Sequence, residues 1–142
     1  MNPTIEKFGY PSMLVKEFDH WVILLRPAQV TLGSLVLAAK SDATAYSRLP
    51  REAFAEQADA VAAIERALTA FVSYERINYV MLMMVDPNVH FHVIPRYSKP
   101  RRWNNTSFAD TGWPGPPQLD SAVRLGNKQL AELVTEIVST FR

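Results

Sequence analysis

The chain has 142 residues, a formal net charge of +1 and 48% apolar residues, which predicts one soluble globular domain spanning residues 1–142. A charge this small excludes an overall field that would attract nucleic acid or a membrane surface. The absence of cysteine excludes disulfides, thiol catalysis and cysteine-bound zinc, and is compatible with a cytoplasmic location. Residues 1–7 lack the layout of a signal peptide, and the longest apolar run, residues 79–85, is too short to cross a bilayer.

The first half of the chain predicts three strands followed by a long helix. Short apolar runs indicate strands at residues 13–18, 21–25 and 34–39. Residues 41–49 are expected to form a loop, after which Pro50 suits a first helical turn. From there to residues 74–75, apolar side chains recur at helical spacing, namely Phe54, Ala58, Val61, Ile64, Leu68 and Phe71.

The second half predicts a hairpin, a long loop and a terminal helix. A strand at residues 78–84 is followed by turn residues 86–88 and then by a second strand, which suggests a tight antiparallel hairpin. Residues 97–117 are rich in turn-forming residues and are expected to form a loop, and Asn127 is expected to cap the last helix. The order of elements predicts an α+β fold with a mostly antiparallel five-stranded sheet, a long helix and a C-terminal helix. Its core would span about residues 13–97, followed by a variable loop and the C-terminal helix in 98–142.

The last of these strands carries two of the three histidines. Because side chains alternate along a strand, His90 and His92 are expected on one face with Asn88 beside them. The residues between them, Val89, Phe91 and Val93, would then face the core. This arrangement holds imidazoles rigidly for nucleophilic or metal chemistry.

The stretch Val89–Arg96, with its histidines alternating with apolar residues and its closing Pro-Arg, resembles the signature strand of the histidine triad (HIT) superfamily. The stretch Leu32–Leu37 resembles that family's Pro-Gly-His-apolar strand, and the order of elements over residues 14–96 is also similar. Two family histidines are replaced here, the first of the triad by Asn88 and the upstream one by Ser34. Residues 85–87 stand in place of the family's glycine-rich loop.

The resemblance implies a hydrolase or nucleotidyl transferase that acts at the α-phosphate of a nucleotide conjugate through a covalent nucleotidyl-histidine. His90 would be the nucleophile, oriented by the backbone carbonyl of Asn88, and His92 would contact phosphate oxygens. Asn88 and Ser34 would support the site, by a hydrogen bond to each other in our hypothesis, and Arg96 would help to bind the substrate. Substrates would be phosphoanhydrides or phosphoramidates, such as dinucleoside polyphosphates or AMP conjugates. The resemblance also implies a homodimer and no tightly bound cofactor or metal, with Mg²⁺ arriving on polyphosphate substrates.

Other interpretations remain open from the sequence. The two histidines could be ordinary strand residues, or could bind zinc together with His20 or Asp86. The altered triad could leave a nucleotide-binding or regulatory module without turnover. A nucleic-acid end-processing enzyme is disfavoured, because the basic residues form only a local cluster of Arg96, Lys99, Arg101 and Arg102.

Overall fold

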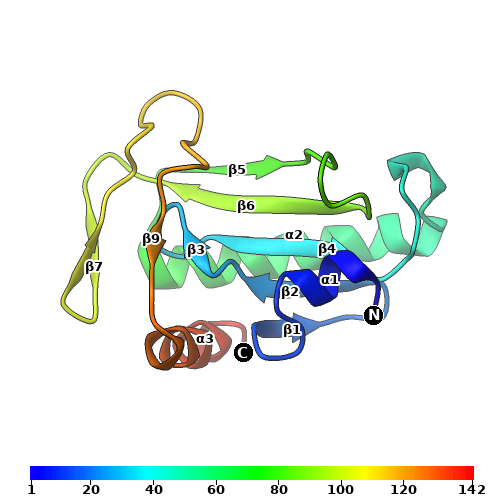
Figure 1. Ribbon diagram of the computed structural model, residues 1–142, viewed down its shortest axis with the longest axis horizontal. Helices are drawn as coiled ribbons and strands as arrows, with labels where there is room; N and C mark the ends of the chain where they lie inside the picture. Colours follow the sequence, from blue (N-terminus) through cyan, green and yellow to red (C-terminus); the bar gives the residue numbers. More distant parts are fainter.

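The computed structural model describes all residues from 1 to 142 and has a five-stranded antiparallel sheet at its centre (Figure 1). The strand order is β1-β2-β4-β6-β5. These strands are β1 (Leu14–Glu17), β2 (Trp21–Leu25), β4 (Leu35–Ala39), β6 (His90–Arg96) and β5 (Arg76–Val80). The fold is therefore the α+β class that the sequence predicts.

Helix α2 (Arg51–Val72) packs against one face of the sheet and encloses the main core with α3 (Asn127–Thr140). In the view of Figure 1, α2 lies behind the sheet. The helix ends where Ser73 adopts a left-handed conformation, which is a common way to terminate a helix. The inward side chains of α2 include Ala60, Ile64 and Leu68, none of which has any exposed surface. The apolar stripe that predicted the helix coincides only in part with the face that it buries, because Ile64 and Leu68 are buried whereas Phe54 and Ala58 are exposed.

The opposite face of the sheet is covered in part by a short N-terminal helix, α1 (Pro3–Lys7), which lies in front of the sheet in Figure 1. Ile5 is fully buried there against Val22, Leu24, Val36 and Ala38. The sequence analysis missed this helix because five residues are too few to show a helical period. Buried residues thus lie outside the span 13–97 at both ends, since Leu133 and Ile137 of α3 also have no exposed surface.

Two small sheets flank the main one. Strand β3 (Ala28–Gln29) pairs with β9 (Val123–Arg124), and β7 (Arg101–Trp103) forms a hairpin with β8 (Thr106–Phe108). The expectation of a loop throughout residues 97–117 is therefore partly wrong, because two short strands lie within this segment. A short 3-10 helix, η1 (Tyr46–Arg48), interrupts the expected loop at 41–49. None of the helices combines the length and the apolar character that crossing a membrane requires.

Two further boundaries differ from the sequence prediction. Strand β5 ends at Val80, so the connection to β6 is long and the hairpin is not tight. Residues 81–87 of this connection carry exposed apolar side chains, among them Met84 and Val85, and we call this segment the methionine loop. At the last helix, Gly126 rather than Asn127 occupies the cap position.

Gly33 sits where the chain enters β4, with a φ of +95°. A Cβ added there would lie 3.2 Å from the Leu68 Cδ2 atom on α2 and 3.5 Å from Pro95 Cγ. Its backbone N–H donates to the side-chain oxygen of Gln29. Only glycine meets this combination of left-handed backbone and close packing without strain.

We expect Gly33→Ala to lower the free energy of unfolding by about 1–3 kcal/mol, because the substitution adds both backbone strain and a tight contact. The matched control is Gly126→Ala, where φ is −71° and a new Cβ meets nothing within 4 Å; its cost should stay below about 1 kcal/mol. Urea unfolding measures both. Equal losses in the two variants would contradict the role assigned to Gly33.

Candidate active site

The histidine strand β6 lies beside β4 with His90 opposite Ala38 and His92 opposite Val36. Their side chains share the face of the sheet that α1 covers, since Val36 and Ala38 belong to the apolar cluster around Ile5. Val89 and Val93 are buried in the main core on the other face. The alternation expected from the sequence is therefore observed, and the two imidazoles stand side by side with ring centroids 5.2 Å apart.

The His90 ring is oriented by the backbone of Asn88. Its Nδ1 atom lies 2.7 Å from the Asn88 carbonyl oxygen. A carbonyl oxygen only accepts hydrogen bonds, so Nδ1 carries the proton and donates it. The lone pair is then on Nε2, and no protein group bonds to this atom. A neutral imidazole in this tautomer has the form that a nucleophile needs.

The His92 ring is held in the opposite tautomer. Arg26, directly after β2, donates from Nε to His92 Nδ1 at 3.3 Å, so the His92 proton is on Nε2. The pKa of His92 is lowered to about 4, chiefly by burial and also by the positive charge of Arg26 and the neighbouring His90, while Asp86 opposes the shift. His92 is therefore neutral at neutral pH and presents an N–H donor beside the His90 lone pair.

Asn88 contributes through its backbone, while its side chain ties the strand to neighbouring segments. The Oδ1 atom accepts from the Thr4 hydroxyl at 2.9 Å, and Nδ2 donates to the Asp42 carbonyl at 3.0 Å. The backbone N–H of Asn88 also donates to Thr4. These bonds fix the carbonyl that orients His90.

Ser34 lies at the opposite end of β4 from Asn88 and is fully buried. Its hydroxyl donates to the Thr31 carbonyl at 2.8 Å and accepts from the Thr31 backbone N–H at 3.0 Å. The expected hydrogen bond between Asn88 and Ser34 is therefore wrong. Each replacement for a family histidine has its own local partners, and Ser34 is not brought to the imidazoles.

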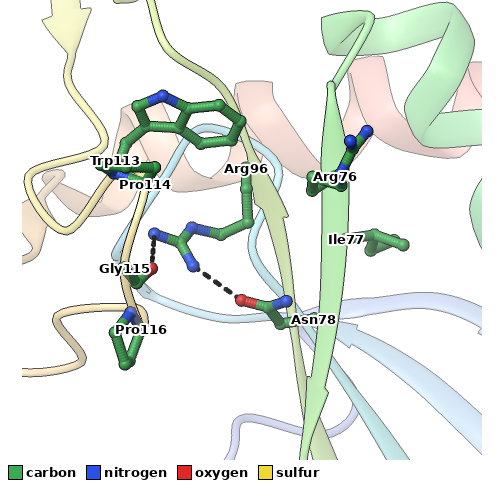
Figure 2. Close-up of a pocket in the computed structure, with 8 residues that line it drawn as sticks. All are labelled: Arg76, Ile77, Asn78, Arg96, Trp113, Pro114, Gly115 and Pro116. Atoms are coloured by element: carbon green, nitrogen blue, oxygen red, sulfur yellow. Dashed lines mark hydrogen bonds between the residues drawn. The ribbon is translucent and has the colours of Figure 1, made fainter.

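Arg96 is also remote from the imidazoles, because it lies four positions beyond His92 along β6, a distance of about 13 Å. Its guanidinium forms a paired bond with Asp110 at 2.7 and 3.0 Å and donates to Asn78 Oδ1 and the Gly115 carbonyl. Figure 2 shows the last two bonds in a cavity of about 580 Å³ that Trp113 overhangs. Arg96 thus clamps the segment around residues 110–115 onto the sheet, a structural role that the substrate-binding interpretation did not foresee.

The N-terminal segment covers the imidazoles. The Phe8 ring lies 5.5 Å from His90 and 5.6 Å from His92, measured between centroids, and Lys7 forms an ion pair of 2.7 Å with Asp86 of the methionine loop. As a result His90 is 2% exposed and His92 7% exposed. A cavity of about 150 Å³ remains between the two rings and the methionine loop, lined there by residues 82–86.

The alternative zinc site gains no support from this geometry. No group of three histidine, cysteine, aspartate or glutamate side chains is placed to hold a metal ion. His20 lies in the β1–β2 turn, where its backbone N–H donates to Glu56 of α2.

Sequence reasoning missed Arg26 and Phe8, which both contact the imidazoles. A signal for Arg26 was present, because it is a lone arginine that directly ends an apolar strand. The same argument had selected Arg96 at the end of the histidine strand. Phe8 carried no comparable signal.

The arrangement was compared with known proteins. No family model and no curated protein matches the sequence. Solved structures do match. A histidine triad protein from Bradyrhizobium japonicum has a TM-score of 0.74 at 14% identity, covering 100% of this chain and 97% of its own. A histidine triad protein from Sinorhizobium meliloti 1021 has a TM-score of 0.75 at 18% identity, covering 99% and 95%.

A more distant match is the Plasmodium falciparum diadenosine triphosphate hydrolase, with a TM-score of 0.62 at 12% identity, covering 91% of this chain and 76% of its own. The chain therefore has the fold of the histidine triad proteins, and the resemblance read from its sequence is confirmed at the level of the fold.

The depressed pKa of His92 predicts a pH-dependent stability. In the unfolded chain the imidazole binds a proton below about pH 6.5, whereas in the folded protein it does so only below about pH 4. The unfolded state therefore binds more protons between these values, and His92 removes up to about 3 kcal/mol of stability as the pH falls through this window. Above about pH 6.5 the His92 ring is unprotonated in both the folded and the unfolded state, so none of this stability is lost.

We expect His92→Gln, which retains an acceptor for Arg26, to show a shallower loss of unfolding free energy between pH 7 and pH 4 than the wild type. Urea unfolding at several pH values measures the difference. Parallel curves for the two proteins would show that His92 does not titrate as described.

Proposed function

We propose that this protein cleaves nucleotide conjugates at the α-phosphate, by hydrolysis or nucleotidyl transfer, through a covalent bond to His90. The observation that carries the proposal is the pair of opposite tautomers. His90 offers an unprotonated Nε2 atom, and His92 beside it offers an Nε2–H donor. Displacement at phosphorus needs both a nucleophile and a donor for the phosphoryl oxygens.

In the first step, the His90 Nε2 lone pair attacks the α-phosphorus and the bond to the leaving group breaks, the leaving group taking the electron pair. The ring becomes positively charged, and the Asn88 carbonyl stabilises that charge by accepting from Nδ1–H. His92 donates to a phosphoryl oxygen as charge develops there. In the second step, water attacks the phosphorus and loses a proton to the solvent, while the bond to Nε2 breaks and its electron pair returns to the ring, which restores neutral His90.

Access to His90 requires the methionine loop to move. The cavity beside the imidazoles measures about 150 Å³, whereas ligand pockets for small molecules usually occupy roughly 300–1,000 Å³. Within a single chain Met84 is 85% exposed and Val85 82% exposed, so few contacts inside the chain resist displacement of the loop. Substrate binding would therefore open the Lys7–Asp86 ion pair, which is weakened by the exposure of the Lys7 side chain to solvent.

The fold supports the substrate class, because one protein that shares it is a diadenosine triphosphate hydrolase. Phosphoanhydrides of this type are accordingly the first substrates to test, alongside AMP phosphoramidates, with and without Mg²⁺. The second candidate function is a nucleotide-binding module without turnover. The almost complete covering of His90 and His92 favours this alternative.

We expect His90→Ala to lower turnover of the best conjugate at least about 1,000-fold, because it removes the nucleophile. The matched control is His20→Ala, which deletes the remaining imidazole at a site whose side chain makes no hydrogen bond; its activity should stay within about twofold of wild type. Steady-state rates over a panel of nucleotide conjugates give the comparison.

Mass spectrometry of the wild type after rapid acid-free quenching should detect a nucleotidyl adduct on the peptide that contains His90. Nucleotide binding without turnover or adduct would instead identify the protein as a binding module. Equal turnover in wild type and His90→Ala would exclude His90 as the nucleophile.

We also propose a homodimer formed through the free edge of β5. This strand ends the sheet order and pairs only with β6, so its outer backbone groups have no partner within the sheet. The neighbouring methionine loop carries the exposed apolar side chains of Leu82, Met84 and Val85. A second copy could pair with the strand edge and bury these residues together.

Light scattering after size exclusion should give about 32 kDa, twice the chain mass of 16.0 kDa. Val85→Asp should shift the protein to 16.0 kDa, because a charge in the apolar contact opposes association. The control Phe54→Asp, on an exposed position of α2, should leave the dimer intact. A wild-type monomer at high protein concentration would refute the proposed pairing.

A further inference from the structure

A further cavity, of about 320 Å³, lies on the same side of the sheet as the imidazoles, between the end of α1 and the β3–β9 pair. It is lined by Lys7, Phe8, Arg26, Pro27, Ala28 and Arg124. Three of these six residues are cationic and none is acidic. We call this space the cationic cavity.

The cationic cavity adjoins the candidate active site through two of its walls. Phe8 lies against both imidazoles. Arg26 donates to His92 from Nε and to the Ala28 carbonyl from Nη1, at 2.6 Å. The Nη2 group of Arg26 has no protein partner, although the side chain is only partly exposed. The Arg26 guanidinium thus donates to His92 through Nε and keeps the N–H donors of Nη2 free.

The two arginines face each other without a counter-charge. Backbone pairing of Ala28 with Arg124 brings Arg124 to this wall, and burial followed by the charge of Arg124 lowers the pKa of Arg26. Neither arginine forms an ion pair, whereas the buried Arg96 is fully engaged with Asp110. Lys7 is paired with Asp86. An anion that binds between these two guanidinium groups would offset their mutual repulsion and accept hydrogen bonds from both.

We propose that the cationic cavity binds a second phosphate group of the substrate, in addition to the phosphate that His90 attacks. This inference rests on the proposed function. Guanidinium groups bind phosphate through paired N–H donors and remain charged at any working pH, which suits a multiply charged anion. The substrate class is therefore a nucleotide conjugate that carries at least two phosphates, either in a chain or with one on the ribose.

The direct test is calorimetric binding of inorganic tripolyphosphate to wild type, Arg124→Gln and Arg102→Gln. Arg124 is exposed on β9, so its substitution should leave the fold intact, which circular dichroism verifies. Arg102 is the matched control, an exposed arginine of β7 away from this cavity. We expect about tenfold weaker binding for Arg124→Gln and wild-type affinity for Arg102→Gln. Equal affinities of the three proteins, or no binding, would overturn the proposal.

The position of the second phosphate follows from three further ligands, AMP, ADP and an adenosine bisphosphate whose second phosphate is on the ribose. The ligand that uses the cavity should bind wild type more tightly than AMP does and should lose that advantage in Arg124→Gln. If neither ligand shows this loss, the proposal is wrong.

The two proposals can fail separately. If turnover depends on His90 but tripolyphosphate binding does not depend on Arg124, the proposed function stands and the proposal for the cationic cavity is wrong. If tripolyphosphate binding depends on Arg124 but the protein shows no turnover, the cationic cavity binds phosphate and the proposed reaction is wrong.

Discussion

The hydrogen bond from the His90 ring to the Asn88 carbonyl, 2.7 Å long, determines which nitrogen of that ring is free to react. The bond depends on β6, which begins at His90, and on the two residues that directly precede this strand. Val89 and Val93 anchor that strand in the core, and the Asn88 side chain ties its beginning to α1 and the segment before η1. A nucleophile at this position therefore needs no histidine at position 88, because the orienting group belongs to the backbone.

A second contact complements the first. Arg26 fixes the neighbouring imidazole of His92 in the opposite tautomer, and burial, followed by the charge of Arg26, lowers the pKa of His92 and keeps the ring neutral. The result is one ring that accepts and one that donates, side by side and shielded from water by Phe8 and the methionine loop. Shielding strengthens each of these electrostatic interactions, but it also makes access to the site depend on movement of the loop. The N-terminal segment is thus part of the site as well as part of the fold.

The sequence predicted those features that depend on local periodicity. The period-two pattern placed His90 and His92 on one face, and the helical spacing identified α2. Features that depend on distant contacts were not predictable in this way. Arg26 and His92 are 66 residues apart, and only the fold distinguishes Arg26, which ends β2 beside an imidazole, from Arg96, which ends β6 beside Asp110. The supposed Asn88–Ser34 contact failed because the two residues lie at opposite ends of β4.

The most direct test of this account is long-range ¹⁵N–¹H nuclear magnetic resonance of the histidine rings at neutral pH. Because the two tautomers give different patterns of nitrogen shifts, the spectrum reports where each proton lies. The account predicts that His90 carries a proton on Nδ1 and that His92 carries its proton on Nε2, with the His92 ring neutral. A charged His92, or the same tautomer in both rings, would contradict it.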